Sequence, residues 1–177
     1  MKFLAVALLA VVAACGQGKV IFNVDAYSFL QGTGKDTIPY NIPPAVTASA
    51  STVQKITLPP GFGSSIVDTV RITSGTANLE NTAGTGTIGF QLFFASDSAA
   101  TYTAPVALNI PPTAVNGAQT VAVPITGDLS NVDSLFQQET VYLRIAATAT
   151  NTGAVFVTGN GVIKALVIRI VLQDKVL

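Results

Sequence analysis

Apolar and polar side chains alternate along several stretches of this chain, and this period of two limits its fold more than any other feature. In the two clearest stretches, 87–95 and 141–149, every second residue is apolar. Successive side chains of a β-strand point to opposite faces, so the pattern predicts strands with one face on a core. The β-branched residues Val, Ile and Thr, which favour strands, make up 55 of the 177 residues. We therefore expect an all-β protein.

Further strands are expected where short apolar or β-branched runs lie between turn signals. These runs are 20–30, 53–58, 65–73, 106–110, 121–125, 155–158 and 162–172. Gly159-Asn160-Gly161 has the composition of a hairpin turn between the last two. Asp128 or Ser130 is expected to cap a short helical turn that ends near Phe136.

About nine strands without a helical layer predict an antiparallel two-sheet β-sandwich. An immunoglobulin-like or a jelly-roll-like Greek key would both satisfy the pattern, and a closed barrel is the alternative. No break in composition marks a second domain, so residues 19–177 are expected to form a single sandwich.

Two further features concern how the strands are covered and where they end. Segment 162–172 is apolar on both faces, apart from Lys164 and Arg169. This predicts a central strand whose outer face meets a loop or helix, or a strand that meets another subunit.

The sequence Asn-Ile-Pro-Pro occurs at 41–44 and again at 109–112. Since proline has no N–H to donate, both proline pairs are expected to end strands.

The amino-terminal segment is an unbroken apolar run of twelve residues, Phe3–Ala14, between Lys2 and the only cysteine of the chain, Cys15. A helix that crosses a membrane needs about 20 apolar residues. The run is therefore too short to span, but it fits the hydrophobic part of a secretory signal.

The run ends in Val12-Ala13-Ala14-Cys15. This sequence resembles the signal of bacterial lipoproteins, in which an aliphatic residue and two small residues precede a cysteine. The resemblance implies that residues 1–14 are a signal peptide and are removed. It also implies a diacylglyceryl group on the sulfur of Cys15 and an acyl chain, such as palmitate, on the new amino terminus. An ordinary cleaved signal with an accidental cysteine is the alternative.

The same resemblance places the protein outside the cytoplasm, in a bacterial cell envelope and anchored by lipid. Enterobacterial lipoproteins retained at the inner membrane carry Asp after the cysteine, whereas this chain has Gly16, so an outer membrane is allowed if the organism has one. Residues 15–18 form a short tether. Three residues separate Cys15 from the first strand and reach at most ~10 Å, so we expect the domain to lie against the membrane.

Composition excludes several kinds of chemistry. Charged residues make up 10% of the chain, nine basic residues balance nine acidic ones, and there is no His. Without a basic excess, no nucleic-acid partner is expected. Without His, catalysis by a His base, or by a thiol paired with one, has no base to use.

Three motifs resemble ligand sites but lack the context that such sites need. Gly84-Thr85-Gly86-Thr87-Ile88-Gly89 has dinucleotide-loop spacing, but it leads into a strand where that loop needs a helix. The stretch 32–37 lacks the Ser or Thr that follows the lysine of a phosphate loop. Asp128, Asn131 and Asp133 offer oxygen ligands without calcium-loop spacing, so a loop cap is expected there. We predict no catalytic, cofactor-binding or metal-binding residue. A hydrolase that uses Asp and Glu alone is a third, weaker hypothesis.

The sequence therefore predicts a lipid-anchored envelope protein that is not an enzyme and whose sandwich serves structural assembly or protein–protein interaction. Its expected partner is an envelope protein or a second copy of itself. The alternative is a lipoprotein that holds a lipid or other apolar ligand between its sheets. In that alternative Phe22, Phe90, Phe94 and Leu143 would point inward.

Overall fold

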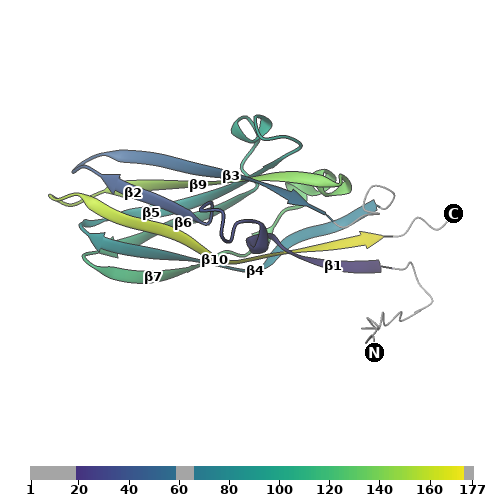
Figure 1. Cartoon of the computed structure of the whole chain (residues 1–177), viewed down its shortest axis with the longest axis horizontal. Helices are drawn as coiled ribbons and strands as arrows, with labels where there is room; N and C mark the ends of the chain where they lie inside the picture. Colours follow the sequence, from purple (N-terminus) through teal and green to yellow (C-terminus); the bar gives the residue numbers. More distant parts are fainter. Residues whose placement is uncertain (1–18, 59–65, 174–177) are drawn as a thin grey trace, which may run out of the picture.

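Two antiparallel sheets packed face to face form the fold, as Figure 1 shows. The structure is a computed structural model that describes residues 19–58 and 66–173. The predicted signal peptide, Cys15 and the rest of the tether lie outside the described residues.

Ten strands lie within the described residues, one more than the approximate count that the sequence predicts. The larger sheet consists of β1 (Lys19–Asp25), β2 (Thr37–Ile42), β4 (Ile66–Ala83), β7 (Gln119–Pro124), β8 (Gly127–Asp128) and β10 (Val157–Gln173). The smaller sheet consists of β3 (Thr47–Thr57), β5 (Thr85–Ala95), β6 (Leu108–Asn116) and β9 (Thr140–Asn151). Three short 3-10 helices complete the described elements: η1 (Ala26–Phe29), η3 (Ala100–Tyr102) and η4 (Ser130–Gln137).

Strand order decides between the two Greek keys that the sequence left open. The larger sheet has the order β1-β10-β4-β7, with β2 beside β10 and β8 beside β4, and the smaller sheet has the order β3-β9-β5-β6. Most connections, such as β3 to β4 and β9 to β10, therefore cross from one sheet to the other. This arrangement is that of a jelly roll. The prediction of an all-β antiparallel sandwich is confirmed.

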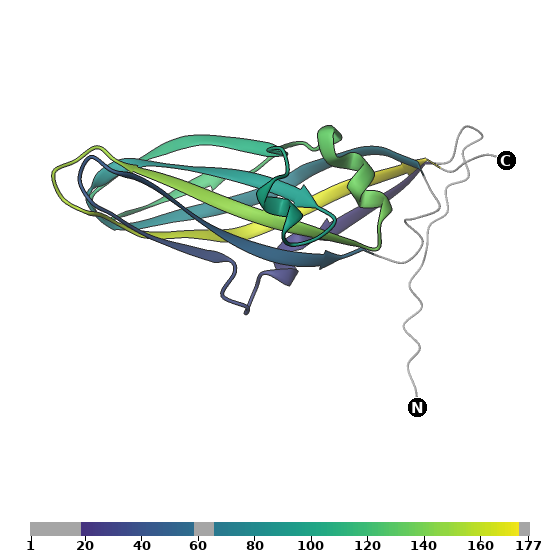
Figure 2. The same ribbon diagram turned by 90° about the horizontal axis from the view of Figure 1, so that it is seen from above.

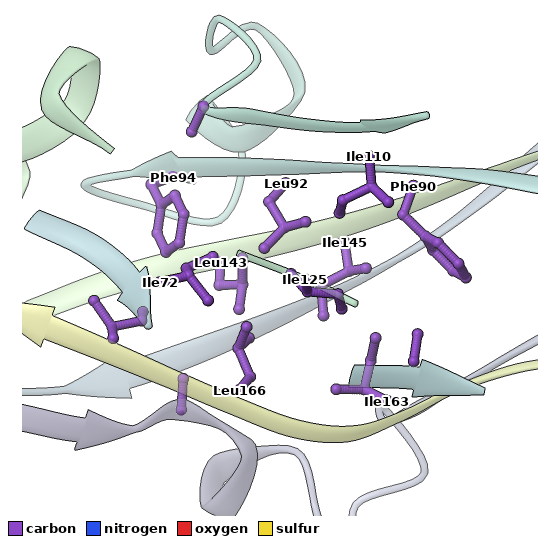
Figure 3. Close-up of a cluster of buried hydrophobic side chains, with 14 of the residues drawn as sticks. Ile72, Phe90, Leu92, Phe94, Ile110, Ile125, Leu143, Ile145, Ile163 and Leu166 are labelled. Atoms are coloured by element: carbon purple, nitrogen blue, oxygen red, sulfur yellow. The ribbon is translucent and has the colours of Figure 1, made fainter. Parts of the chain in front are cut away.

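The core lies between the sheets and is built from their inward faces (Figure 3). Phe90, Phe94 and Leu143 are at most 1% exposed, as the alternation predicts. The ring of Phe94 lies 5.4 Å from that of Phe136, which η4 brings over the end of the core. Phe22 is only partly buried, at the margin of the core. Burial of each such large side chain stabilises the fold by about 1.5–3 kcal/mol.

The predicted hairpin at Gly159-Asn160-Gly161 is wrong, because these residues lie inside the continuous strand β10. They pair with β2 on one side and β4 on the other. A Cβ on Gly159 would lie 2.4 Å from the carbonyl oxygen of Glu80 and 2.5 Å from the hydroxyl of Tyr40. Glycine is therefore needed here for close packing and not for a turn.

The two-faced apolar pattern of 162–172 has a local cause. A shift in the pairing of β10 with β4 lies between Ile163 and Ala165. Beyond this bulge the opposite set of side chains faces inward, so Ile163 and Leu166 are both fully buried. The outward residues Val167 and Val171 lie between β1 and β4 and are half-buried.

Other boundaries also differ from the prediction. The strand expected over 20–30 ends at Asp25, whose carboxylate accepts hydrogen bonds from the N–H groups of Tyr27 and Ser28 and starts η1. The strand expected over 65–73 continues to Ala83, through the Ser74-Gly75 pair that resembled a turn. The second proline pair lies within β6 and does not end it. An edge strand tolerates proline, and the pairing with β5 is irregular there.

The short helical turn is confirmed as η4. The Asp128 carboxylate accepts a hydrogen bond from the N–H of Ser130 at 2.8 Å. Val132 and Phe136 point into the core from its inner side.

Candidate interaction edge

The edges of the two sheets differ in how well they are protected against pairing with another strand. An edge strand presents unpaired N–H and C=O groups, and natural proteins blunt such edges with proline, bulges or short strands. Strand β6 carries Pro111 and Pro112 beside a bulge. Strand β7 has six residues and ends in Pro124, and β2 has six residues that include Pro39.

Strand β3 lacks these protections, and we call its outer side the open edge (Thr47–Thr57). It has eleven residues and no proline. All eleven pair with β9 without a bulge, from Thr47 opposite Thr150 to Thr57 opposite Thr140. The five residues Thr47–Ser51 are all exposed. Lys55 is the only charged residue of the strand. The open edge is therefore long, regularly paired and almost uncharged.

Small apolar side chains line the space beside the open edge. Ala48 and Ala50 pair with the buried residues Ala149 and Ala147, so they point between the sheets, yet both are exposed. A cavity of about 90 Å³ opens here, between β3 and the residues Ile38 to Ile42 of β2, and we call this cavity the slot. Pockets for small molecules begin at roughly 300 Å³. The slot therefore suits an aliphatic side chain better than a lipid.

This geometry is suited to the addition of a strand. An extended segment laid along β3 would form main-chain hydrogen bonds and direct every second side chain towards the slot. Specificity would come from small or medium apolar side chains at alternate positions.

Two buried asparagines hold the loops at one end of the sandwich, the end opposite the start of β1 in Figures 1 and 2. The Asn151 amide donates to the carbonyl oxygens of Ile42 and Val155, each at 2.8 Å, and accepts from the N–H of Gly153 at 2.8 Å. The Asn81 amide donates to the carbonyl oxygens of Ala83, Gly84 and Gly117. We call this end the tip (Val46, Gly84, Gly117 and 152–156).

The hydroxyl of Tyr40 joins this network by donating to the side-chain oxygen of Asn81 at 3.2 Å. Burial raises the pKa of Tyr40 to about 12, and the negative charge of Glu80 adds to the rise. Because Tyr40 also packs over Gly159 and borders the slot, it links the tip to the open edge.

On the outer face of the smaller sheet, Arg144 fixes η3. Its guanidinium carbon lies 3.7 Å from the centre of the Phe93 ring and 4.9 Å from that of Tyr102. Its Nε also donates to the carbonyl oxygen of Thr101 at 2.9 Å. These contacts give the guanidinium of Arg144 a structural role, because they hold η3 against the smaller sheet.

A larger hollow of about 370 Å³ lies outside the core, between the end of β5, η3 and η4. No Asp, Glu, Lys or Arg is among its lining residues, which include Thr103, Asn131 and Ser134. It therefore offers no charged group for acid–base chemistry.

The predicted motifs take ordinary structural roles. Gly84 is a turn residue with φ of 80°, and the stretch that follows it is strand β5, as expected. Asn131 donates to the carbonyl oxygen of Val106, while the Asp128 carboxylate accepts from the N–H of Ser130, the first residue of η4. Among residues 19–58 and 66–173, no cluster of three His, Cys, Asp or Glu side chains could hold a metal ion. In the same ranges, no helix has the length and apolar character needed to cross a bilayer. The predicted lipid site, Cys15, lies outside these residues.

Neither a known family model nor a curated protein matches the chain. Among solved structures, the chain is similar to a structure of the infectious bursal disease virus Gx strain, with a TM-score of 0.36 and 10% sequence identity over 79% of this chain and 33% of that one. A T13 particle of the same virus gives a TM-score of 0.35 and 7% identity over 98% of this chain and 44% of that one. The chain therefore spans less than half the length of these structures.

Proposed function

We propose that the protein is a lipid-anchored module of a bacterial cell envelope that acts by binding another protein and not by catalysis. The anchor is the lipid on Cys15, and the membrane is the outer one if the organism has one. The observation that carries the binding role is the open edge. All eleven residues of β3 pair with β9 on one side of the strand, and the small residues Thr47–Ser51 are exposed.

The partner in this proposal is an extended segment of an envelope protein that adds a strand to the smaller sheet at β3. Hydrogen bonds between main chains supply the affinity, and an aliphatic side chain in the slot beside Ala48 and Ala50 supplies selectivity. An edge without proline or bulge is hazardous if nothing covers it, because unrelated strands can also pair with it. A dedicated partner removes this hazard.

A matched pair of substitutions tests the role of the open edge. Ala50→Lys places a charge on the inner side of the edge, over the slot, whereas Ser51→Lys places the same charge on the outer face of the same strand. Both residues are exposed, so both variants are expected to fold. An inward charge at an edge is a natural device against strand addition.

The full chains are extracted from native membranes with mild detergent and sized by sedimentation. We expect the wild type and Ser51→Lys to sediment with a partner and Ala50→Lys to sediment alone. The role of the edge is refuted if the wild type sediments alone or if both variants behave in the same way. Intact mass of the extracted chain tests the anchor separately, since it reports the loss of residues 1–14 and the acyl chains on Cys15.

A further inference from the structure

The exposed aliphatic side chains of the described residues include a group at the end of the larger sheet where β1 begins. We call this end the base. Val20 is 48% exposed, Ile21 is 50% exposed and Ile66 is 44% exposed. Large apolar side chains left this open to water usually mark a contact surface when they gather in one place.

Strand register places Ile21 and Ile66 on the same outward face of the larger sheet, whereas Val20, which pairs with the buried Leu172, points to the opposite face at the same strand end. Gln173 of β10 pairs with Lys19 on one side and with Ile66 on the other, so the start of β1, the end of β10 and the start of β4 lie side by side. Ile21 pairs with the half-buried Val171, which extends the apolar surface across β10. Figures 1 and 2 show all three strand ends at one end of the sandwich, away from the tip.

Among the described residues, the two charged ones nearest to the strand ends form an ion pair. The ammonium of Lys19 lies 2.8 Å from a carboxylate oxygen of Asp68. Its hydrogen bond is the main cause that holds the pKa of Asp68 below its usual range. This ion pair compensates the charges next to Ile66 and the start of β1, and the next charged residues described on the same face, Arg169 and Arg71, lie further from the strand ends.

The length of chain between Cys15 and β1 identifies what covers the base. Only Gly16, Gln17 and Gly18 separate the lipid-bearing residue of the proposed function from Lys19, and three residues reach at most ~10 Å. Side chains that lie one or two residues beyond Lys19 are therefore held within reach of the interfacial layer of the bilayer. Helices that lie in this layer bury their apolar side chains about 5–10 Å deep at the boundary of headgroups and acyl chains.

We propose that the base is a membrane-contact surface, in which Val20, Ile21 and Ile66 enter the interfacial layer of the bilayer that holds the Cys15 lipid. This inference rests on the proposed anchor and goes beyond it, because a lipid alone would leave the domain free to tilt. The contact fixes the strands upright, with the open edge running away from the membrane and the tip furthest from it.

Fluorescence on the full lipidated chain tests this orientation. Because Cys15 is the only cysteine and its thiol carries lipid in the proposed function, one introduced cysteine can be labelled alone. Ile66→Cys and, as a second position, Ile21→Cys receive an environment-sensitive dye. Val155→Cys at the tip is the control, and Val155 is 60% exposed. The proteins are reconstituted in phosphatidylcholine–phosphatidylglycerol vesicles with and without brominated acyl chains.

We expect the dyes at positions 66 and 21 to shift to the blue and to lose at least about half of their emission in brominated vesicles, and the dye at 155 to do neither. A blue shift without quenching would mean that protein covers the base and would overturn the inference. Equal behaviour at the base and the tip would also overturn it. If intact mass shows lipid on Cys15 in these samples, the proposed anchor survives that failure; if it shows no lipid, anchor and membrane contact fail together.

Discussion

Replacing Asn151 by Ala should lower the free energy of unfolding by more than the loss of one small side chain would suggest. The side chain is 2% exposed and makes three hydrogen bonds, two as donor to the carbonyl oxygens of Ile42 and Val155 and one as acceptor from Gly153. Each hydrogen bond contributes about 1 kcal/mol net, and a buried group that loses its partner costs about 1–3 kcal/mol. We therefore expect a loss of about 3 kcal/mol in the free energy of unfolding.

Urea denaturation of residues 16–177, without the lipid-bearing cysteine, measures this loss if unfolding is two-state. In thermal denaturation of the same variant, the expected fall in Tm is about 6–12 °C, since 1 kcal/mol corresponds to roughly 2–4 °C in a domain of this size. Asn41→Ala is the control, because the Asn41 side chain accepts one exposed hydrogen bond, from Thr158. A surface change of this kind costs about 0.5 kcal/mol or less. If the two variants lose equal stability, the assigned role of Asn151 in holding the tip is wrong.

Two further predictions concern the packing beside the open edge. Gly159→Ala should cost several kcal/mol in urea denaturation, because its Cβ would meet the Glu80 carbonyl at 2.4 Å, whereas Gly153→Ala, with its nearest contact at 3.4 Å, should be tolerated; equal effects would contradict the close packing of β10. Stability should also fall at alkaline pH, because the pKa of Tyr40 is about 12 in the folded protein against an ordinary value of 10.0. The contribution of the neutral phenol is complete below pH 10 and is lost as pH rises through 12, at about 1.4 kcal/mol per pH unit. Denaturation at pH 9 and pH 11 should show this fall in the wild type and a smaller one in Tyr40→Phe, and an identical slope in both proteins would refute the assignment.

Alternation made the centre of the fold predictable. Strands β5 and β9 have one face on the core, so their period of two is visible in the sequence, and both lie where it places them. The predictions from glycine and proline at 159–161 and 111–112 were wrong, because both residue types occur inside strands as well as at their ends. In β10 Gly159 provides close approach to Tyr40, and in β6 the prolines occupy an edge, although both patterns are typical of strand ends.

The candidate site was the part least visible in the sequence. Only 53–58 was predicted as a strand, because the inward residues Ala48 and Ala50 are small and exposed, so their alternation with Thr and Ser gives little contrast in hydrophobicity. They face a slot and not the dense core. Whether a strand lies at an edge depends on the order of strands in the sheet, which is set by distant segments of the chain. The lipid site at Cys15 is a prediction from sequence alone, because a lipoprotein signal is a local sequence pattern.

Hydrogen–deuterium exchange along β3 tests the central claim most directly. The full chain is labelled once in its native membrane and once after it is produced without other envelope proteins and purified in detergent, and the peptide that covers Thr47–Thr57 is compared with one that covers the edge strand β7. If an envelope protein adds a strand at the open edge, exchange in the β3 peptide should be markedly slower in the membrane, while that in the β7 peptide stays the same. Exchange in β3 that is equally fast in both samples would contradict the account.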